Sequence, residues 1–310
     1  MLEFYRISTH HLTALEPSAG ADVVLTANPT AREQEQLCRL FDLDPLTFAF
    51  CNSAEEVSRF HFISSTIIED AAVLVLYDFI GHYDTIEQQL APAIIIFNQS
   101  CLIICTEAIT ACRQLLIKTI NEDGAILDIV FSCINLWQDR LLKALLGYKQ
   151  QIDQLDAAAS QTVKNAELRE MTDLTRKLVF FEHTMNDQSG TLTAFFSAPQ
   201  LQSFSHRVID NTKTRQRRLT KTIHIYRDLL SSIGSLFTAM MDNNLNHLMK
   251  YLDSAGLVIA VIALVTGFMG MNVGGLPWKA STNGFILTCI VALILATATG
   301  IYLKRKRFSD

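Results

Sequence analysis

Residues 266–277 have the sequence T-G-F-M-G-M-N-V-G-G-L-P and end a long apolar run. Within that run, residues 254–271 contain no charged side chain, and residues 284–303 form a second run without charge. About 20 apolar residues at 1.5 Å each cross a hydrocarbon core of ~30 Å, so each run is long enough to span a membrane. The sequence therefore predicts two transmembrane helices joined by a short loop, residues 272–283.

The composition limits how much of the chain lies in the membrane. Of its 310 residues, 49% are hydrophobic and 18% are charged, which is too polar for a protein built of many spans. The net charge of −5 argues against nucleic acid as a partner. The seven cysteines form no C-x-x-C pair and are interpreted as free thiols in a reducing cytosol. We expect a large soluble part attached to two spans.

Basic residues predict the orientation of the spans. Lys250 precedes the first run, and the loop between the runs contains only Lys279. Four basic residues close the second run: Lys304, Arg305, Lys306 and Arg307. Because basic residues concentrate on the cytosolic side, both termini are expected inside, in a multi-pass protein of the cytoplasmic (inner or plasma) membrane.

Residues 1–107 carry the signals of an α/β cytosolic domain. A helix is predicted over residues 30–40, with Thr30 as its N-cap. Apolar segments separated by short polar turns predict the strands of a largely antiparallel sheet. These segments are residues 21–25, 60–68, 71–80, 93–97 and 102–105, with tight turns at 69–70 and 98–100. Four acids here, Glu69, Asp70, Asp78 and Asp84, are interpreted as solvated groups on a sheet edge.

The remaining residues predict helices. Residues 108–202 are expected to form antiparallel helices with turns near 121–124 and 186–190. Their apolar face consists of Leu127, Phe131, Ile134, Leu141 and Leu145, interrupted once by Gln138. Residues 203–252 predict a stalk helix that continues without a proline into the membrane segment 253–310, which ends in the basic tail 304–310. A helix of about 70 residues, on the order of 100 Å long, cannot bury its own apolar stripe and needs copies of itself.

The motif Gly270-Met271-Asn272, with N-x-x-M-K-x-L at residues 246–252, resembles the CorA divalent-cation transporter family. The resemblance implies a homopentameric funnel whose first span lines a central pore and whose second span forms an outer ring. It implies an amide ring of Asn272 that binds the hydrated ion at the outer mouth. It also implies a gate of Met249 and Leu252, a polar ring of Asn246, and a basic collar of Lys304, Arg305, Lys306 and Arg307.

The chemistry of the ion agrees with this motif. Mg²⁺ dehydrates reluctantly, so neutral amide oxygens that accept hydrogen bonds from its water shell bind it without trapping it. In isolation, Asn272 is also interpretable as a helix C-cap. Small residues at 256, 260, 263 and 267 predict either a pore wall or a packing face. Asp253 is a candidate ion-facing carboxylate at the inner end of the span, or a group in interfacial water.

Some residues depart from the magnesium-type pattern. The loop has no acidic residue, and its G-G-x-P sequence resembles the ZntB-type zinc-transporting branch. The transported ion therefore stays open between Mg²⁺, with Co²⁺ or Ni²⁺, and Zn²⁺, which could be coupled to protons. A non-transporting membrane-anchored scaffold or sensor is the alternative of another class. No enzyme motif such as H-E-x-x-H is present, and no cofactor beyond the transported ion is expected.

Overall fold

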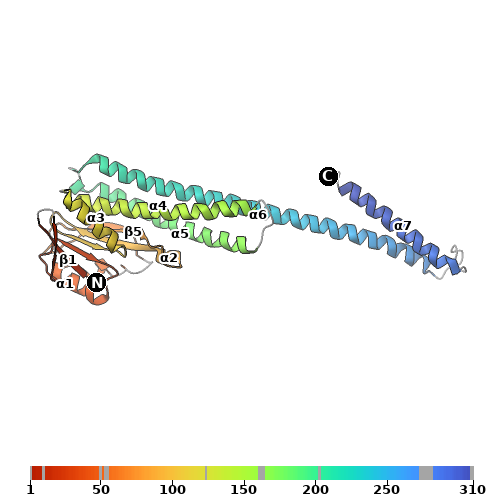
Figure 1. Ribbon diagram of the computed structural model, residues 1–310, viewed down its shortest axis with the longest axis horizontal. Coiled ribbons are helices and arrows are strands. Elements are labelled where there is room, and N and C mark those ends of the chain that lie inside the picture. The colour runs from red at the N-terminus through yellow and green to blue at the C-terminus, as the bar shows by residue number, and fades with distance from the viewer. Residues whose placement is uncertain are drawn as a thin grey trace. The chain divides into compact units, whose positions relative to one another are not determined.

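The computed structural model describes residues 2–8, 11–48, 51, 56–122, 124–159, 165–201, 204–271 and 282–307. They fall into two compact units, unit 1 (residues 1–234) and unit 2 (residues 235–310). The strands, labelled in part in Figure 1, are β1 (Leu2–Ser8), β2 (His11–Leu15), β3 (Val23–Thr26), β4 (Arg59–Phe62), β5 (Ala72–Phe79), β6 (Leu90–Phe97) and β7 (Leu102–Cys105). The helices are α1 (Ala31–Phe41), η1 (Pro45–Phe48), α2 (Ile86–Gln89), α3 (Ile109–Asn121), α4 (Ile126–Ala159), α5 (Asn165–Phe196), η2 (Pro199–Leu201), α6 (His206–Met269) and α7 (Thr282–Arg307).

The seven strands form one sheet in the order β2-β1-β3-β7-β6-β5-β4. Every neighbouring pair is antiparallel except β3 and β7, which run parallel. The predicted largely antiparallel sheet is therefore confirmed. Its inner strands β3 and β7 are buried along their whole length, which explains why their sequences are continuous apolar runs rather than alternating ones.

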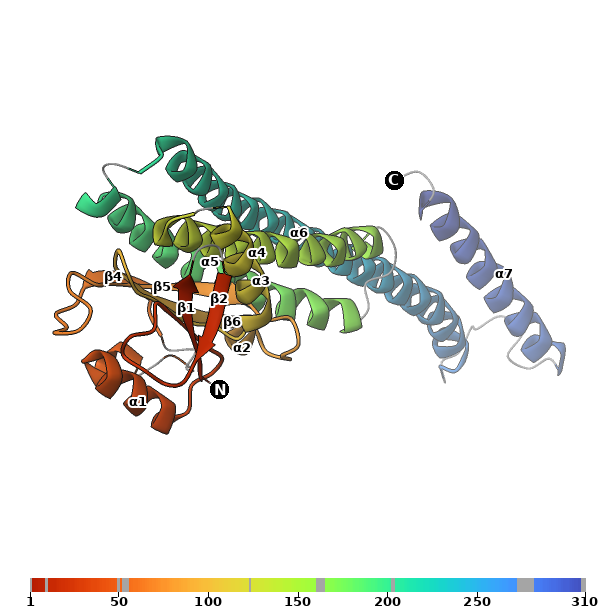
Figure 2. The ribbon, with the colours of Figure 1, turned by 60° about the vertical axis from the view of Figure 1, so that its left-hand side comes forward.

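Helices cover both faces of this sheet (Figure 2). Leu74 and Leu76 of β5 belong to the core cluster that includes residues of α3 and α4. Val73 and Val75, which point to the opposite face, belong to the cluster that includes Leu37 and Phe41 of α1. The period of two along β5 thus divides its side chains between two apolar layers.

The start of α1 agrees with the sequence prediction. The Thr30 hydroxyl accepts a hydrogen bond from the Glu33 backbone N–H at 3.4 Å, and the Glu33 carboxylate accepts one from the Thr30 backbone N–H at 2.8 Å. This reciprocal arrangement is a capping box, which satisfies two backbone donors at the helix start.

The predicted strand over residues 60–68 is too long. β4 ends at Phe62, and residues 63–68 form an irregular connection. The predicted turn at residues 69–70 is confirmed, with Asp70 at a φ of 53°. In the irregular connection the Ser65 hydroxyl accepts hydrogen bonds from the backbone N–H groups of Ile67 and Ile68, at 3.1 and 3.0 Å. Such side-chain bonds compete with the strand ladder, and the apolar residues alone did not reveal them.

One predicted helix turn is confirmed and the other is wrong. α3 ends at Asn121 and α4 begins at Ile126, which confirms the turn near residues 121–124. α5, however, continues through residues 186–190, because Gln188 is buried at 1% exposure and is held by tertiary hydrogen bonds. The chain instead leaves α4 after Ala159, in a stretch without Gly or Pro that gave no turn signal.

α6 and α7 contain the two predicted spans. α6 has 64 residues and α7 has 26. By length and composition both are able to cross a membrane, and the most apolar window of each is almost entirely exposed, with 0% and 6% of its residues buried. The long uninterrupted helix expected over residues 203–271 is observed over His206–Met269.

Candidate functional site

The residues expected to line an ion path lie on the C-terminal part of α6. Asn246, Met249 and Asp253 follow one another by three and four positions, which places them on one face of the helix. Met249 and Leu252 are each 59% exposed, and the whole segment 241–253 is exposed. The structure of a single chain therefore covers none of these side chains.

Small residues continue the same face toward the end of α6. They are Gly256, Ala260, Ala263 and Gly267, at spacings of three and four. A Cβ atom added at Gly256 or Gly267 would meet nothing within 4 Å. Packing inside one chain therefore does not require these glycines, and their small size leaves space for groups outside the chain.

The helix ends at Met269, directly before the glycine of the motif. The Gly270 backbone N–H donates to the Thr266 carbonyl at 2.9 Å, and the Met271 N–H donates to the Phe268 carbonyl at 3.3 Å, three residues back. A Cβ at Gly270 would lie 3.2 Å from the Thr266 carbonyl oxygen, so a side chain there would crowd this last turn. Asn272 and the loop through residue 281 lie outside the described residues, so the amide ring stays a prediction.

The predicted gate and the motif are separated by a membrane thickness. Met249 and Met269 are 20 positions apart on the helix, which is about 30 Å at 1.5 Å per residue. The hydrocarbon core of a bilayer is also ~30 Å thick. Met249 and Asp253 are therefore placed near one membrane surface when Gly270 is near the other.

The basic collar is only partly described. Lys304 and Arg305 are exposed near the end of α7. Lys306 and Arg307 belong to the same helix, but their side chains are outside the description. Among the residues that the structure does describe, no group of three or more His, Cys, Asp or Glu could hold a metal ion.

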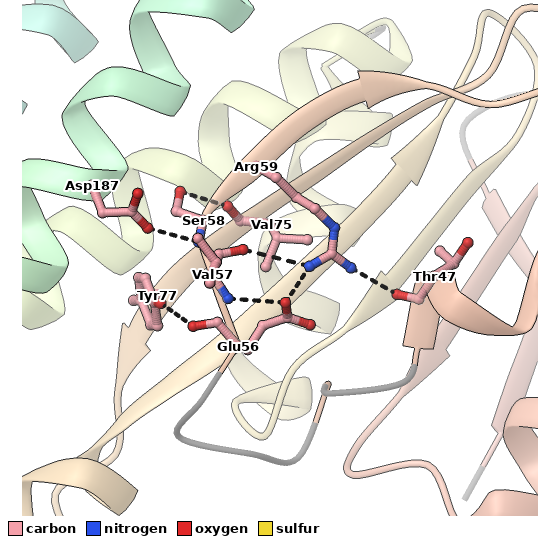
Figure 3. Close-up of polar contacts among 8 residues, drawn as sticks. All are labelled: Thr47, Glu56, Val57, Ser58, Arg59, Val75, Tyr77 and Asp187. Atoms are coloured by element: carbon pink, nitrogen blue, oxygen red, sulfur yellow. Dashed lines mark hydrogen bonds and ion pairs between the residues drawn. The ribbon is translucent and has the colours of Figure 1, made fainter.

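Unit 1 contains a buried polar cluster that the sequence did not indicate (Figure 3). Glu56 is 4% exposed and forms an ion pair with Arg59, whose guanidinium also donates to the Thr47 carbonyl at 3.2 Å. The Tyr77 hydroxyl donates to the Glu56 carbonyl at 2.5 Å, and burial raises the pKa of Tyr77 to about 12, so it stays a neutral donor. This cluster fastens the edge strand β4 to η1 and β5.

Asp78 corrects the interpretation of the sheet acids as solvated. It is 1% exposed and forms an ion pair with Arg140 of α4, with 2.9 Å between Oδ1 and Nε. Burial raises the pKa of Asp78 to about 7, although Arg140 and the Phe79 N–H act in the opposite direction. The sequence could not reveal this burial, because it depends on where α4 crosses the end of β5.

Together these features define the class of protein: an α/β unit and long helices followed by two candidate membrane helices. A family model described as "CorA-like Mg2+ transporter protein" matches residues 24–305. The chain belongs to this family, which confirms the resemblance seen in the sequence.

Known proteins support the same fold. The cobalt/magnesium transport protein CorA of Thermotoga maritima is 19% identical over 182 residues, which cover 58% of this chain and 52% of that protein. The matched segment thus spans about half the length of that relative. The complete structure of the CorA magnesium transporter from Methanocaldococcus jannaschii superposes with a TM-score of 0.79 at 16% identity, covering 98% of this chain and 97% of that one.

A second branch is also similar. The ZntB cytoplasmic domain from Vibrio parahaemolyticus has a TM-score of 0.62 at 12% identity and covers 78% of this chain and 98% of its own. At such identities the likeness shows the fold and does not distinguish the transported ion.

Proposed function

We propose that this chain transports divalent cations, with Mg²⁺ as the main ion and Co²⁺ or Ni²⁺ as further ones, across the cytoplasmic membrane. The observation that carries the proposal is the exposed face of α6. It holds Asn246, Met249 and Asp253, continues with small residues, and ends at the Gly-Met-Asn motif. A helix whose membrane segment carries no charge and has a face of small residues is suited to line a path between copies of the chain.

In the proposed assembly, five copies place this face of α6 around a central axis, with α7 outside. This arrangement would cover the exposed apolar residues of both helices with other copies and with lipid, which an isolated chain in water would leave unfavourably exposed. The partners are thus further copies of the chain, the lipid bilayer and divalent cations, and nucleic acid is not among them. Both termini lie in the cytosol.

Each predicted residue then has a physical role. A ring of Asn272 amides accepts hydrogen bonds from the waters of the hydrated ion. Met249 and Leu252 form an apolar constriction that loses its water when it narrows, and Asn246 lies one turn beyond it. Asp253 adds carboxylates that attract cations to the inner end. The basic collar, Lys304 to Arg307, favours the cytosolic position of that end.

The proposal divides the chain by role as the sequence predicts. Residues 1–107 and 108–202 form the α/β and helical parts of the cytosolic domain, residues 203–252 the stalk, and residues 253–310 the membrane part. Along the chain, the division between the two compact units falls after Gly234, inside the proposed stalk segment. The transported ion is the substrate, and the transport path uses no separate cofactor.

Transport of Zn²⁺, with or without coupling to protons, is the second candidate function. It is favoured by the G-G-x-P sequence after Asn272 and by the similarity to a ZntB cytoplasmic domain. A hydrated zinc ion has the same charge as hydrated magnesium, so an amide ring that holds the water shell accepts either.

The substitution Asn272→Ala tests the proposed role of the motif. Purified full-length protein is placed in liposomes, and entry of Mg²⁺ is followed with a fluorescent indicator. We expect entry to be lost in Asn272→Ala and kept in the control Asn211→Ala, which removes an exposed amide of the same helix in unit 1. Oligomer size is measured for both variants. Full transport by an intact Asn272→Ala oligomer would contradict the amide ring, and an assembled wild type without any flux would favour the scaffold alternative.

A further inference from the structure

Three helices of unit 1 share a buried layer of glutamines. Gln138 of α4, Gln188 of α5 and Gln216 of α6 are 1–3% exposed. The Gln216 carbonyl oxygen Oε1 accepts hydrogen bonds from Gln188 Nε2 at 3.0 Å and Gln138 Nε2 at 3.3 Å. Gln188 Oε1 in turn accepts the backbone N–H of Tyr77 in β5 at 2.9 Å. Hydrogen bonds therefore lead without interruption from the sheet to α6.

Asp78, which follows Tyr77 in β5, is bound by the segment of α4 that contains Gln138. Arg140 pairs with Asp78, and its Nη2 donates to the Phe79 carbonyl at 2.8 Å. Its neighbour Asp139 forms an ion pair with Arg215 of α6. Residues 138–140 of α4 thus bind α6 through two side chains and the end of β5 through the third.

Asp78 and Gln138 each have a buried side-chain oxygen without a hydrogen-bond partner among the residues described, and of the two only Asp78 can ionise. Its Oδ1 accepts from the Phe79 N–H at 2.7 Å and pairs with Arg140, but its Oδ2 is buried and has no partner among the residues described. A buried carboxylate oxygen without a partner is unfavourable, and a proton on it removes the charge. The site is therefore suited to take up a proton.

The charged and titratable groups around Asp78 come from several elements. α4 contributes the Arg140 guanidinium and the thiol of Cys133, whose pKa is raised well above its ordinary value by its hydrogen bond to Cys112 of α3 and by burial, so it stays neutral. The segment after β7 contributes Glu107, whose Oε2 is also buried without a partner in the described part of the chain. β6 contributes only the apolar Ala91, opposite Asp78 in the register. Among the described residues, the charges that act on Asp78 are therefore one cation, Arg140, and one further carboxylate, Glu107.

We propose that Asp78 is a proton-binding site. Proton uptake there weakens the ion pair between Asp78 and Arg140, which joins β5 to α4, and so makes transport respond to cytosolic pH. The carboxylate takes its proton from solvent and becomes a neutral acid. Arg140 keeps its charge, its bond to the Phe79 carbonyl and its access to water, since its side chain is 30% exposed. The effect on transport rests on the proposed function, whereas the proton site and its ion pair with Arg140 do not.

The sign of the effect on stability follows from burial. Because the pKa of Asp78 in the folded chain is raised to about 7 from 3.8, the folded state binds more protons than the unfolded state between these values. This group therefore makes unit 1 more stable as pH falls from about 7, and less stable as pH rises through that value. Asp78→Asn, which cannot ionise, removes this contribution to the pH dependence.

Infrared difference spectroscopy of the full-length protein tests the proton site directly. We expect a band of a buried protonated carboxyl to appear as pH is lowered across a range centred on 7. It should be absent in Asp78→Asn and unchanged in Asp153→Asn, a control acid of α4 that is 58% exposed. An unchanged band in Asp78→Asn, or no band in the wild type, would overturn the assignment.

A second variant keeps the test valid if Asp78→Asn does not fold. Arg140→Gln removes the positive charge that opposes protonation, so the midpoint of the same band should move to higher pH. An unmoved midpoint would overturn the pairing of the two groups as the basis of the site.

Transport is then measured in liposomes with a fixed ion gradient while pH is varied only on the side of unit 1. Wild-type flux should change with a midpoint near pH 7, and Asp78→Asn flux should stay at the acidic wild-type level throughout. Wild-type flux without such a midpoint, together with a titrating band, would overturn the link to transport. Absence of all flux would contradict the proposed function and leave the infrared result to decide the proton site.

Discussion

The two parts of α6 differ in what surrounds them. In unit 1 the helix buries a residue at nearly every turn, including Ile209, Gln216 and Ile223. Between residues 241 and 253 the same helix buries none. Helical propensity is therefore not what distinguishes the two parts. The first has its packing partners within its own chain. The second has none in the described part of the chain, and under the proposed function it finds them in lipid and in other copies.

The polar side chains of α6 also differ between the two units. In unit 1 α6 buries polar side chains and hydrogen-bonds them to neighbouring helices, as Gln216 is bonded to α4 and α5. In unit 2 Asn246 and Asp253 are exposed side chains in the single chain. Side chains that are satisfied internally hold the fold, whereas exposed polar groups next to a membrane span are free to face an ion. The following substitutions test this difference, beginning with the largest expected effect.

Phe131→Ala should show the largest loss of stability. Its ring is 1% exposed and packs against Phe195 and Phe204, with centroids 5.6 and 4.7 Å away. We expect a loss of about 3–5 kcal/mol in the free energy of unfolding of unit 1, measured by denaturant titration. The control is Leu264→Ala, where the leucine is 73% exposed, and this variant should leave that unfolding unchanged. Similar losses in both variants would remove the contrast between the two parts.

Gln188→Leu tests whether the buried hydrogen bonds of unit 1 matter to its stability. The substitution leaves the Tyr77 backbone N–H without its acceptor, which should cost about 1–3 kcal/mol. Gln150→Leu, at an exposed position of α4, is the matched control and should change the free energy of unfolding little. Equal effects of the two substitutions would show that the network contributes nothing specific.

Leu252→Ser tests the exposed part as a gate. If copies of Leu252 close an apolar constriction, a hydroxyl there should favour water and raise basal flux roughly tenfold. Leu229→Ser, which alters a leucine of α6 in unit 1 that is 44% exposed, should leave flux unchanged. Flux is compared in liposomes at matched protein amounts. An increase in the control but not in Leu252→Ser would place the gate elsewhere.

Thr30→Ala is expected to have the smallest effect. It removes the hydroxyl that caps α1, which should lower the stability of unit 1 by about 1 kcal/mol. Transport should be unaffected, because α1 lies in the part of the chain that folds on its own contacts. A clear change in flux would show that α1 and the ion path are coupled.

Much of the fold could be predicted because its signals are local. The charge-free runs indicated α7 and the end of α6, and Thr30 indicated the start of α1. The continuous course of α5 through residues 186–190 could not be predicted, because Gln188 is held by residues far away in sequence. The burial of Asp78 depends on Arg140 in the same way.

The candidate site shows a different limit. Helical spacing predicted Met249 and Asp253 on one face, the family resemblance added Asn246, and α6 places all three on that face. Their proposed roles require several chains, so neither the sequence nor the structure of one chain brings them together. The chemistry of an ion path is then a property of the assembly, and transport itself has to be measured.

The most direct test is ion entry into liposomes that hold the full-length wild-type protein, comparing Mg²⁺ with Zn²⁺. Each ion is offered with and without an imposed pH gradient, while pH on the side of unit 1 is held constant. The account predicts Mg²⁺ entry that is indifferent to the gradient. Zn²⁺ entry that rises with inward proton drive, with no entry of Mg²⁺, would contradict it.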